Sequence, residues 1–247
     1  MFKSNNLDGA MSPTQHMNND VWYSLIESNT ESGRTLLPFL PNKNGYCNVT
    51  PAKTVDGYEF TGIQQLMAKI HLHKMGHDNE RICTFNDALK HDTFIKRGEK
   101  GFYLPRYDKK EGKVGVVKYF SANQVGDKDK LPYVDVDASK TEQKDKEPFV
   151  QATSNPAEYI GNYLMCVHQN RPFTAPAEVA NKFKQELAAE IRKDPLSLFK
   201  ICNQAQKRIY EQDVAEGKLK AAELQKPGQE KEPKKAQKQV EREGVER

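Results

Sequence analysis

The chain has 247 residues, of which 36% are hydrophobic and 29% charged, and its formal net charge is +4. No stretch holds the roughly 18 apolar residues that a membrane helix needs, and the first residues lack the apolar core of a signal peptide. The four cysteines are scattered without CxxC spacing, which argues against a zinc knuckle and against a disulfide framework. These features predict a cytoplasmic protein with reduced thiols, no membrane segment and a sizeable solvated part.

The positive charge is concentrated in one short segment. Residues 93–120 contain eight Lys or Arg and three Asp or Glu, a net charge of +5, whereas the rest of the chain sums to −1. A local basic excess of this kind is typical of a surface that contacts phosphates. This segment is therefore the first candidate for a functional region.

The first part of the chain predicts short helices. Residues 1–20 show no hydrophobic periodicity and are predicted to be a disordered arm. Apolar residues at helical spacing predict a short helix near residues 22–26 and a longer helix over residues 63–76. Thr84 and Asp87 have the spacing of a capping box, so we expect another short helix to begin there.

From residue 93 the pattern changes to strands. Residues 94–95, 102–104 and 114–120 are separated by glycines or polar turns, which predicts a small antiparallel β-meander. Alternation along the middle strand places Tyr103 on the opposite face from its two neighbours. Because tyrosine tolerates solvent better than phenylalanine, we expect Tyr103 and Tyr107 to be exposed.

The second part of the chain predicts helices. Most of residues 138–150 lack large apolar side chains, which predicts a linker. Three helices, each with a proline near its start, are expected across residues 151–213, where apolar faces indicate a small all-α module. Residues 214–247 are predicted to be a charged, largely disordered tail. The predicted fold class is α+β, with short helices packed on the basic meander in an N-terminal domain over residues 21–137.

The meander combines cations with aromatic side chains, a mixture that favours single-stranded nucleic acid. Cationic side chains follow a phosphate backbone, while aromatic faces stack on unpaired bases that a closed duplex does not present. The alternative interpretation is a solvated hairpin that protects an edge strand, with the aromatic residues on its core face. The predicted DNA-contacting residues are Lys96, Arg97, Lys100, Tyr103, Arg106, Tyr107, Lys109, Lys110, Lys113 and Lys118.

Five short motifs follow one another between residues 48 and 127. They are Asn48-Val49-Thr50, Phe60-Thr61-Gly62-Ile63, Thr84-Phe85-Asn86-Asp87-Ala88, Ile95-Lys96-Arg97-Gly98-Glu99-Lys100-Gly101 and Phe120-Ser121-Ala122-Asn123-Gln124. Their order and spacing resemble the N-terminal domain of ArdC-type antirestriction proteins, over about residues 21–127. The resemblance implies a sequence-nonspecific single-stranded-DNA-binding protein of a mobile genetic element, such as a plasmid, phage or conjugative element.

Full-length members of that family continue into a metallopeptidase-like domain with an H-E-x-x-H helix. None of the six histidines in this chain is followed by glutamate, so the motif is absent and the predicted helices take the place of that domain. We therefore expect a protein that is not an enzyme and needs no cofactor. Its task would be antirestriction or an accessory role in DNA transfer or replication.

A protein-binding adaptor or inhibitor is the first alternative function. A protein partner would dock on the predicted helices of residues 151–213, and an exposed apolar face there would favour this interpretation. The side chains that would form such a face are Phe183, Leu187, Phe199 and Ile209.

A metal-dependent hydrolase that uses His71, His73 and His77 is the second alternative. His73 and His77 are four residues apart, a spacing that places two side chains on one helical face. His71 diverges from His73 in direction, and no general base accompanies the cluster in sequence. We therefore predict no metal site.

Overall fold

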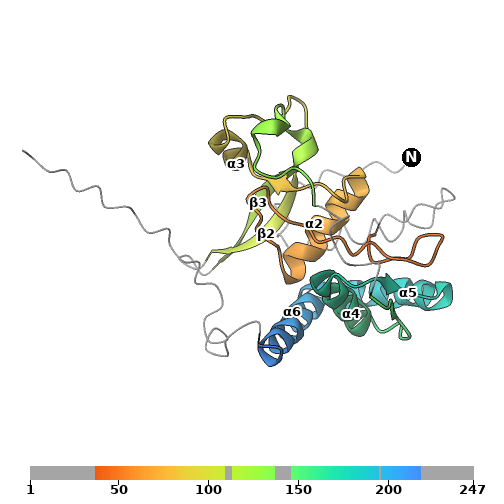
Figure 1. Cartoon of the computed structure of the whole chain (residues 1–247). Coiled ribbons are helices and arrows are strands. Elements are labelled where there is room, and N and C mark those ends of the chain that lie inside the picture. The colour runs from red at the N-terminus through yellow and green to blue at the C-terminus, as the bar shows by residue number, and fades with distance from the viewer. Residues whose placement is uncertain (1–36, 109–112, 137–145, 195, 218–247) are drawn as a thin grey trace, which may run out of the picture. The chain divides into compact units, whose positions relative to one another are not determined.

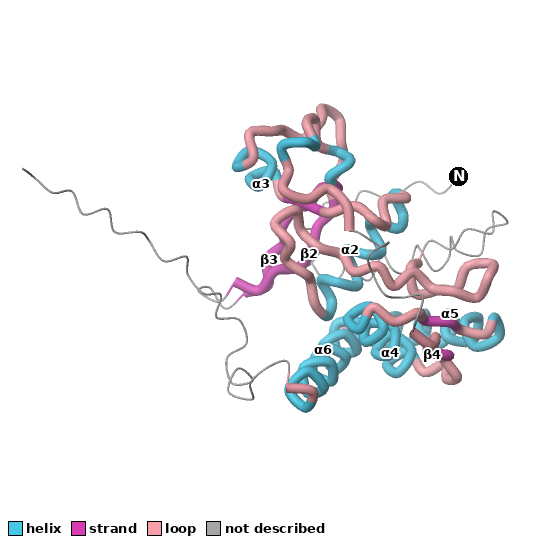
Figure 2. Tube along the Cα trace, viewed as in Figure 1, coloured by secondary structure: helices cyan, strands magenta, loops and turns pink. Residues whose placement is uncertain are grey.

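The computed structural model describes residues 37–108, 113–136, 146–194 and 196–217 (Figure 1). The predicted arm over residues 1–20, the predicted helix near residues 22–26 and residues 218–247 of the predicted tail lie outside the described residues. The elements are α2 (Gly62–Met75), β1 (Ile82–Cys83), α3 (Phe85–Lys90), β2 (Phe102–Asp108), β3 (Lys113–Ser121), η1 (Ala122–Gln124), η2 (Lys128–Lys130), β4 (Phe149–Val150), α4 (Pro156–Gln169), β5 (Phe173–Thr174), α5 (Ala177–Lys193) and α6 (Ser197–Ala215). This mixture of helices and a small antiparallel sheet confirms the predicted α+β class (Figure 2).

Helix α2 lies between the sheet and the C-terminal helices. It contacts β2 on one side and α4 on the other, as Figure 1 shows. Most of its side chains are buried, including Leu66 and Ile70, because both sides of the helix are covered. The helix ends at Gly76, as the apolar spacing predicted. α2 thus connects the two halves of the chain.

The three-stranded sheet has the order β1-β3-β2, and both pairings are antiparallel. Strands β2 and β3 confirm two of the three predicted strands. The prediction that residues 94–95 form the third strand of this sheet is wrong. The strand Ile82–Cys83 pairs with β3 on the side opposite β2 instead. Residue Ile95 instead forms a single bridge with Val125, after the chain has turned through η1.

Strand β2 is the other edge of the sheet, and at Pro105 its outward backbone groups are not available for pairing with another strand. Pro105, in the middle of this strand, has no N–H group to offer. Its carbonyl oxygen accepts a hydrogen bond from Gln64 Nε2 of α2 at 2.7 Å. The edge is therefore poorly suited to pairing with another strand.

Helix α3 begins with the predicted capping box. Thr84 Oγ1 accepts a hydrogen bond from the Asp87 backbone N–H at 3.1 Å, and Asp87 Oδ2 accepts one from the Thr84 backbone N–H at 2.8 Å. Both groups would otherwise lack an intrahelical partner. This reciprocal pair fixes the start of α3.

Replacing Thr84 by alanine should lower the free energy of unfolding by about 1 kcal/mol, because the Asp87 N–H loses its acceptor. Urea denaturation of the two proteins measures the difference. A Thr84→Ser change retains the hydroxyl and should keep most of the stability. Equal losses in both variants would show that the methyl group matters and the cap does not.

The helices of the second half begin near the predicted prolines. Pro156 is the first residue of α4, and Asn155 Oδ1 caps it by accepting from the N–H groups of Ala157 and Glu158. Pro176 precedes the first residue of α5. The third proline lies outside the described residues, and α6 begins at Ser197. Proline is favoured at these positions because the first helical N–H groups have no partner within the helix.

One hydrophobic core joins both halves, which differs from the predicted separation into a DNA-binding domain, a linker and a helical module. The Phe39 ring contacts Tyr163 of α4 and Phe183 of α5 at centroid distances of 5.9 and 5.8 Å. Tyr159 of α4 stacks on Phe183 at 3.8 Å and donates from its hydroxyl to the Phe39 carbonyl at 3.0 Å. The helices bury their apolar faces against the first half because they need a common core.

The predicted linker over residues 138–150 is partly structured. Phe149 and Val150 form β4, which pairs in parallel with β5, and the Phe149 ring stacks on Phe173 at 5.8 Å. Residues 137–145 lie outside the described residues. The end of the predicted linker thus belongs to the folded part.

The apolar face that would have favoured a protein-binding adaptor is covered. Phe183 and Leu187 are fully buried, and Phe199 and Ile209 are half-buried against the same core. Their apolar surface is used within the chain. The structure therefore removes the observation on which that alternative depended.

The chain divides into two units after Ile209. The end of α6, from Tyr210, belongs to the second unit, in which Gln212 Nε2 donates to Glu216 Oε1 at 2.6 Å. No helix in the described ranges combines the length and the apolar character that crossing a membrane requires.

Candidate nucleic-acid interface

The hairpin formed by β2 and β3 has one buried and one exposed face. Phe102 and Leu104 are buried, whereas Tyr103 between them is 56% exposed, which confirms the predicted alternation. Lys118 lies directly across from Tyr103 in the register, and Val116 on the same side is also exposed. We call the exposed face around Tyr103, Val116 and Lys118 the hairpin surface.

Lys118 lies over two aromatic rings, the exposed Tyr103 and the buried Phe120. Its Nζ atom is 5.8 Å from the centroid of the Tyr103 ring and 5.3 Å from that of Phe120. These cation–π contacts hold the ammonium group beside an exposed aromatic face. A cation and a stacking ring therefore lie side by side, as phosphate and base contacts require.

Gly101 brings the cationic loop before β2 onto the hairpin. A Cβ atom at this position would lie 2.5 Å from the Tyr119 carbonyl oxygen and 3.0 Å from Lys118 Cε. Only glycine allows this approach. The loop over residues 96–101, here called the basic loop, is therefore continuous with the hairpin surface.

Gln124 fixes the shape of the basic loop. Its Nε2 donates to Glu99 Oε2 at 2.8 Å and to the Lys100 carbonyl at 3.1 Å, and its Oε1 accepts from the Ser121 N–H at 2.9 Å. Gly98 turns the loop with a φ of +87°, a conformation that favours glycine. The glycines, Glu99 and Gln124 of the recurring motifs therefore have structural roles, which leaves the contact with a ligand to the cations.

The three cations of the basic loop are exposed but differ in their contacts. Lys96 Nζ donates to the Asn123 carbonyl at 2.9 Å, which attaches the loop to η1. Arg97 and Lys100 are exposed and make no ion pair with any of the described residues. These two charges are consequently the ones most available to phosphates.

The structure places Gly101, at the end of the loop that carries Lys96, Arg97 and Lys100, against Lys118, which lies over Tyr103. The other predicted DNA-contacting residues fall into two groups. Only the backbone is described for three of them, which occupy register positions in β2 and β3, and two lie outside the described residues. The former are Arg106, Tyr107 and Lys113, and the latter are Lys109 and Lys110.

Phe94 is an exposed aromatic residue that the prediction of contacts left out. Its side chain is 58% exposed, more than that of Tyr103. The neighbouring Thr93 is buried and Ile95 packs on the small core around Val125. A buried threonine beside an exposed phenylalanine is the reverse of what hydrophobicity predicts, so no local pattern in the sequence indicated this exposure.

The three histidines of the alternative metal site have other contacts. His73 Nδ1 lies 2.8 Å from Asp78 Oδ1, and the His71 ring stacks on Phe102 at 4.7 Å. His77 Nε2 lies 3.3 Å from Asn123 Nδ2. Among the described residues, no group of three or more His, Cys, Asp or Glu side chains could hold a metal ion. The three histidines therefore do not come together as a set of metal ligands within the described part of the chain.

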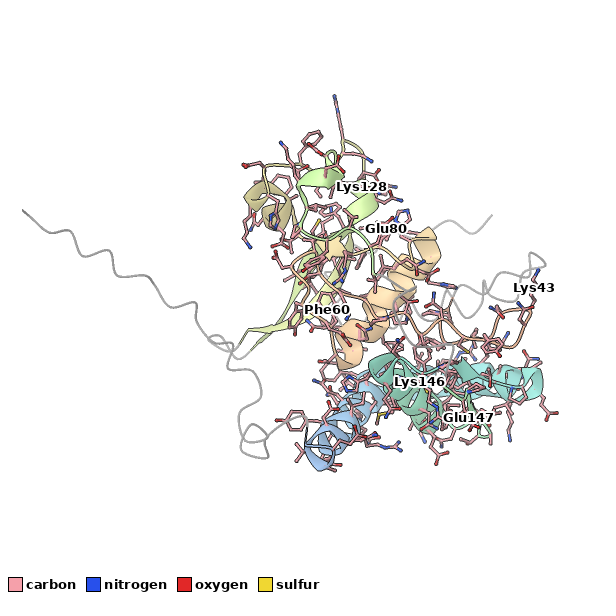
Figure 3. All side chains as sticks on the ribbon, in the orientation of Figure 1. Lys43, Phe60, Glu80, Lys128, Lys146 and Glu147 are labelled. Carbon is pink, nitrogen blue, oxygen red and sulfur yellow. The ribbon has the colours of Figure 1, made fainter. Side chains whose placement is uncertain are left out.

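Close to His77, a further lysine is engaged within the fold. Lys128 Nζ donates to Asn123 Oδ1 and lies 3.8 Å from Glu80 Oε1, an ion pair whose two residues Figure 3 labels. Asn123 thus contacts Lys96 through its carbonyl and Lys128 through its side chain. These contacts brace η1 beneath the basic loop.

All four cysteines are buried and unpaired. Burial raises the pKa of the Cys47, Cys83 and Cys166 thiols to about 12, and it raises the pKa of Cys202 further. A thiol with such a pKa is protonated near neutral pH, so it is a poor nucleophile. Burial within the core gives these thiols a structural role.

One known family matches more than half of the chain. The sequence matches the family described as the N-terminal domain of anti-restriction factor ArdC over residues 15–155. No curated protein matches the chain. Two crystal structures of the antirestriction ArdC protein from the R388 plasmid resemble its fold. The Mn(II)-bound structure has a TM-score of 0.56 at 15% identity, and the metal-free structure has 0.53 at 16%.

Each match covers 83% of this chain and 99% of the R388 protein, which is more than the first 155 residues could supply. The likeness of fold thus extends into the C-terminal helices, which the sequence motifs did not predict. One of the two R388 structures holds Mn(II). The described residues of this chain offer no set of ligands that fits such an ion.

Proposed function

Because the chain belongs to the family of N-terminal domains of anti-restriction factor ArdC, we propose that it binds single-stranded DNA without sequence preference. Its biological task would be antirestriction or an accessory role in DNA transfer on a mobile genetic element such as a plasmid. The proposed partner is the strand itself, which the chain would cover by contacting phosphates and unpaired bases.

The observation that carries the proposal is the continuity of the basic loop with the hairpin surface. Gly101 lies against Lys118, and Lys118 lies over the exposed Tyr103 ring. Cations that attract a phosphate backbone are therefore placed beside a ring that can stack on a base. Stacking requires an unpaired base, which supports a single strand over a duplex.

Binding should depend strongly on salt. If about five phosphates are contacted, the logarithm of the affinity should fall with the logarithm of the salt concentration with a slope of about −3.5, from about −0.7 per contact on a single strand. Changing Arg97 and Lys100 together to alanine should make that slope shallower by about 1.4 and weaken binding to all sequences alike. Fluorescence anisotropy of labelled oligonucleotides of mixed sequence, titrated at several salt concentrations, measures both quantities.

A matched control removes two cations from another surface. Lys182 and Lys193 are exposed on α5, which lies away from the hairpin in Figure 1, and replacing both by alanine should leave the salt slope unchanged. The affinity of the native chain is also measured for single-stranded DNA, duplex DNA and single-stranded RNA of the same sequence. A salt-independent affinity, or tighter binding of the duplex or of RNA, would contradict the proposal.

A further inference from the structure

Phe94 lies flat against a glycine on the segment that follows β3. The Gly126 N–H donates to the Phe94 carbonyl at 2.8 Å, and the Lys96 N–H donates to the Gln124 carbonyl at 2.9 Å. Residues 93–96 therefore run antiparallel to residues 124–127, with Phe94 opposite Gly126. A Cβ atom on Gly126 would lie between 2.5 and 2.9 Å from three atoms of the Phe94 ring.

The contact with Gly126 explains how the Phe94 ring is held in place but not why the ring is exposed to solvent. A ring that covers a glycine across a strand pair contributes to stability by shielding the backbone. Phe94 nevertheless remains 58% exposed, and within the described residues its ring makes no aromatic or cation–π contact. A large apolar ring held in place with most of its surface in water is a ready contact for a ligand.

Cations follow Phe94 along the chain, at residues 96, 97 and 100, whereas Asp92 precedes it and Asp127 follows Gly126. Because Ile95 packs inward, Phe94 and Lys96 extend from the same side of the segment. The short segment of residues 124–126 contacts both sites. Gly126 lies against the Phe94 ring, and Gln124 donates a hydrogen bond to the Lys100 carbonyl. Two residues of extended chain span roughly 7 Å, so the ring and the basic loop are near neighbours. The free charges of Arg97 and Lys100 complement phosphates.

We infer that Phe94, seated on Gly126, is a base-stacking platform that extends the surface formed by the basic loop and Tyr103. This inference rests on the proposed function and names a second base contact for it. The ligand is a single strand, whose sugar-phosphate backbone follows Lys96, Arg97 and Lys100 while one unpaired base covers the Phe94 ring. A duplex has no exposed base face to place there.

Three substitutions at Phe94 separate stacking from plain hydrophobic contact. Phe94→Ala should weaken binding of a single-stranded oligonucleotide about tenfold, the loss expected for one base–aromatic contact. Phe94→Leu keeps apolar volume without an aromatic face and should lose nearly as much. Phe94→Trp keeps the face and should bind within about twofold of the native chain. The exposed position lets all three variants fold, which thermal unfolding verifies.

The variant Gly126→Ala disturbs the contact that positions the Phe94 ring and leaves the ring itself in the protein. Its Cβ atom meets the outer end of the Phe94 side chain, which can swing away, so the variant should fold and yet bind several-fold more weakly. Neither this variant nor Phe94→Ala removes a charge, so the salt slope should stay at the native value. Their affinity for a duplex should also be unchanged.

The outcomes distinguish this inference from the function on which it rests. If the native chain binds no single strand, both fail. If Arg97 and Lys100 matter while Phe94→Ala and Gly126→Ala bind like the native chain, only the stacking platform is refuted. Native affinity in Phe94→Leu, or equal losses for duplex and single strand, would also overturn it.

Discussion

Replacing Phe183 by alanine should lower the free energy of unfolding by about 3–5 kcal/mol, the cost of deleting a fully buried aromatic side chain. The ring is completely inaccessible and lies between Tyr159, at 3.8 Å, and Phe39, at 5.8 Å. Phe183 belongs to α5, whereas Phe39 precedes α2. The loss should therefore destabilise both halves of the chain.

Hydrogen exchange of backbone amides distinguishes a single core shared by both halves of the chain from two independent cores. In the Phe183→Ala variant, amides of β3 and of α4 should lose protection by the same free energy, because one core supports both. Val150→Ala, at a side chain that is 60% exposed, is the control and should change stability by less than about 0.5 kcal/mol. Loss of protection in the helices alone would show that the hairpin folds separately.

The second large effect concerns Lys69, a buried lysine of α2. Only 3% of this residue is exposed. Its Nζ donates to the Thr50 carbonyl and to Asn48 Oδ1, the latter at 3.3 Å, and lies 5.9 Å from the centroid of the Tyr163 ring. The Tyr163 hydroxyl in turn donates to the Asn48 carbonyl at 2.6 Å. Burial lowers the pKa of Lys69 from its ordinary 10.5 to about 7, against the opposing attraction of Asp78 and Cys47.

Stability should consequently rise with pH above 7. Between pH 7 and 10.5 the unfolded chain binds a proton on Lys69 that the folded chain has released, so raising the pH favours the folded state. The slope should approach about 1.4 kcal/mol per pH unit. The buried cysteines act in the opposite direction above about pH 9, because their thiols ionise in the unfolded chain first. The useful window is therefore pH 7 to 8.5.

Comparison with Lys69→Met isolates this contribution. Denaturant unfolding at pH 7, 7.5, 8 and 8.5 should give a stability difference between native and variant chains that changes by about 2 kcal/mol in favour of the native chain. Lys90→Met, at an exposed lysine whose side chain is 65% accessible, should reproduce the native pH profile. A pH-independent difference for Lys69→Met would mean that Lys69 keeps its proton when folded.

Local features of this fold could be predicted from the sequence where neighbouring residues determine them. The apolar spacing of α2, the capping box of α3 and the alternation in β2 each depend on residues a few positions apart. The apolar faces of α4 and α5 were also predictable, but an amphipathic pattern does not specify what covers it. The shared core therefore became evident only in three dimensions.

The candidate site was predicted in part for the same reason. Charge and alternation identified Lys96, Arg97, Lys100, Tyr103 and Lys118. The role of Gln124 depends on contacts across 24 or 25 residues, which no local pattern encodes. Phe94 was counted as a strand residue of the meander, and its exposure follows from pairing with Gly126 and not with the sheet.

The closed edge of β2 has a consequence for chains that gather on one strand. Under the proposed function, several copies would be held side by side at a high local concentration, and exposed sheet edges would then tend to join into larger sheets. Pro105 offers no N–H group there, and its carbonyl is already bound to Gln64. Copies that bind next to one another on DNA should therefore not pair through β2. They should dissociate from the DNA when the salt concentration rises.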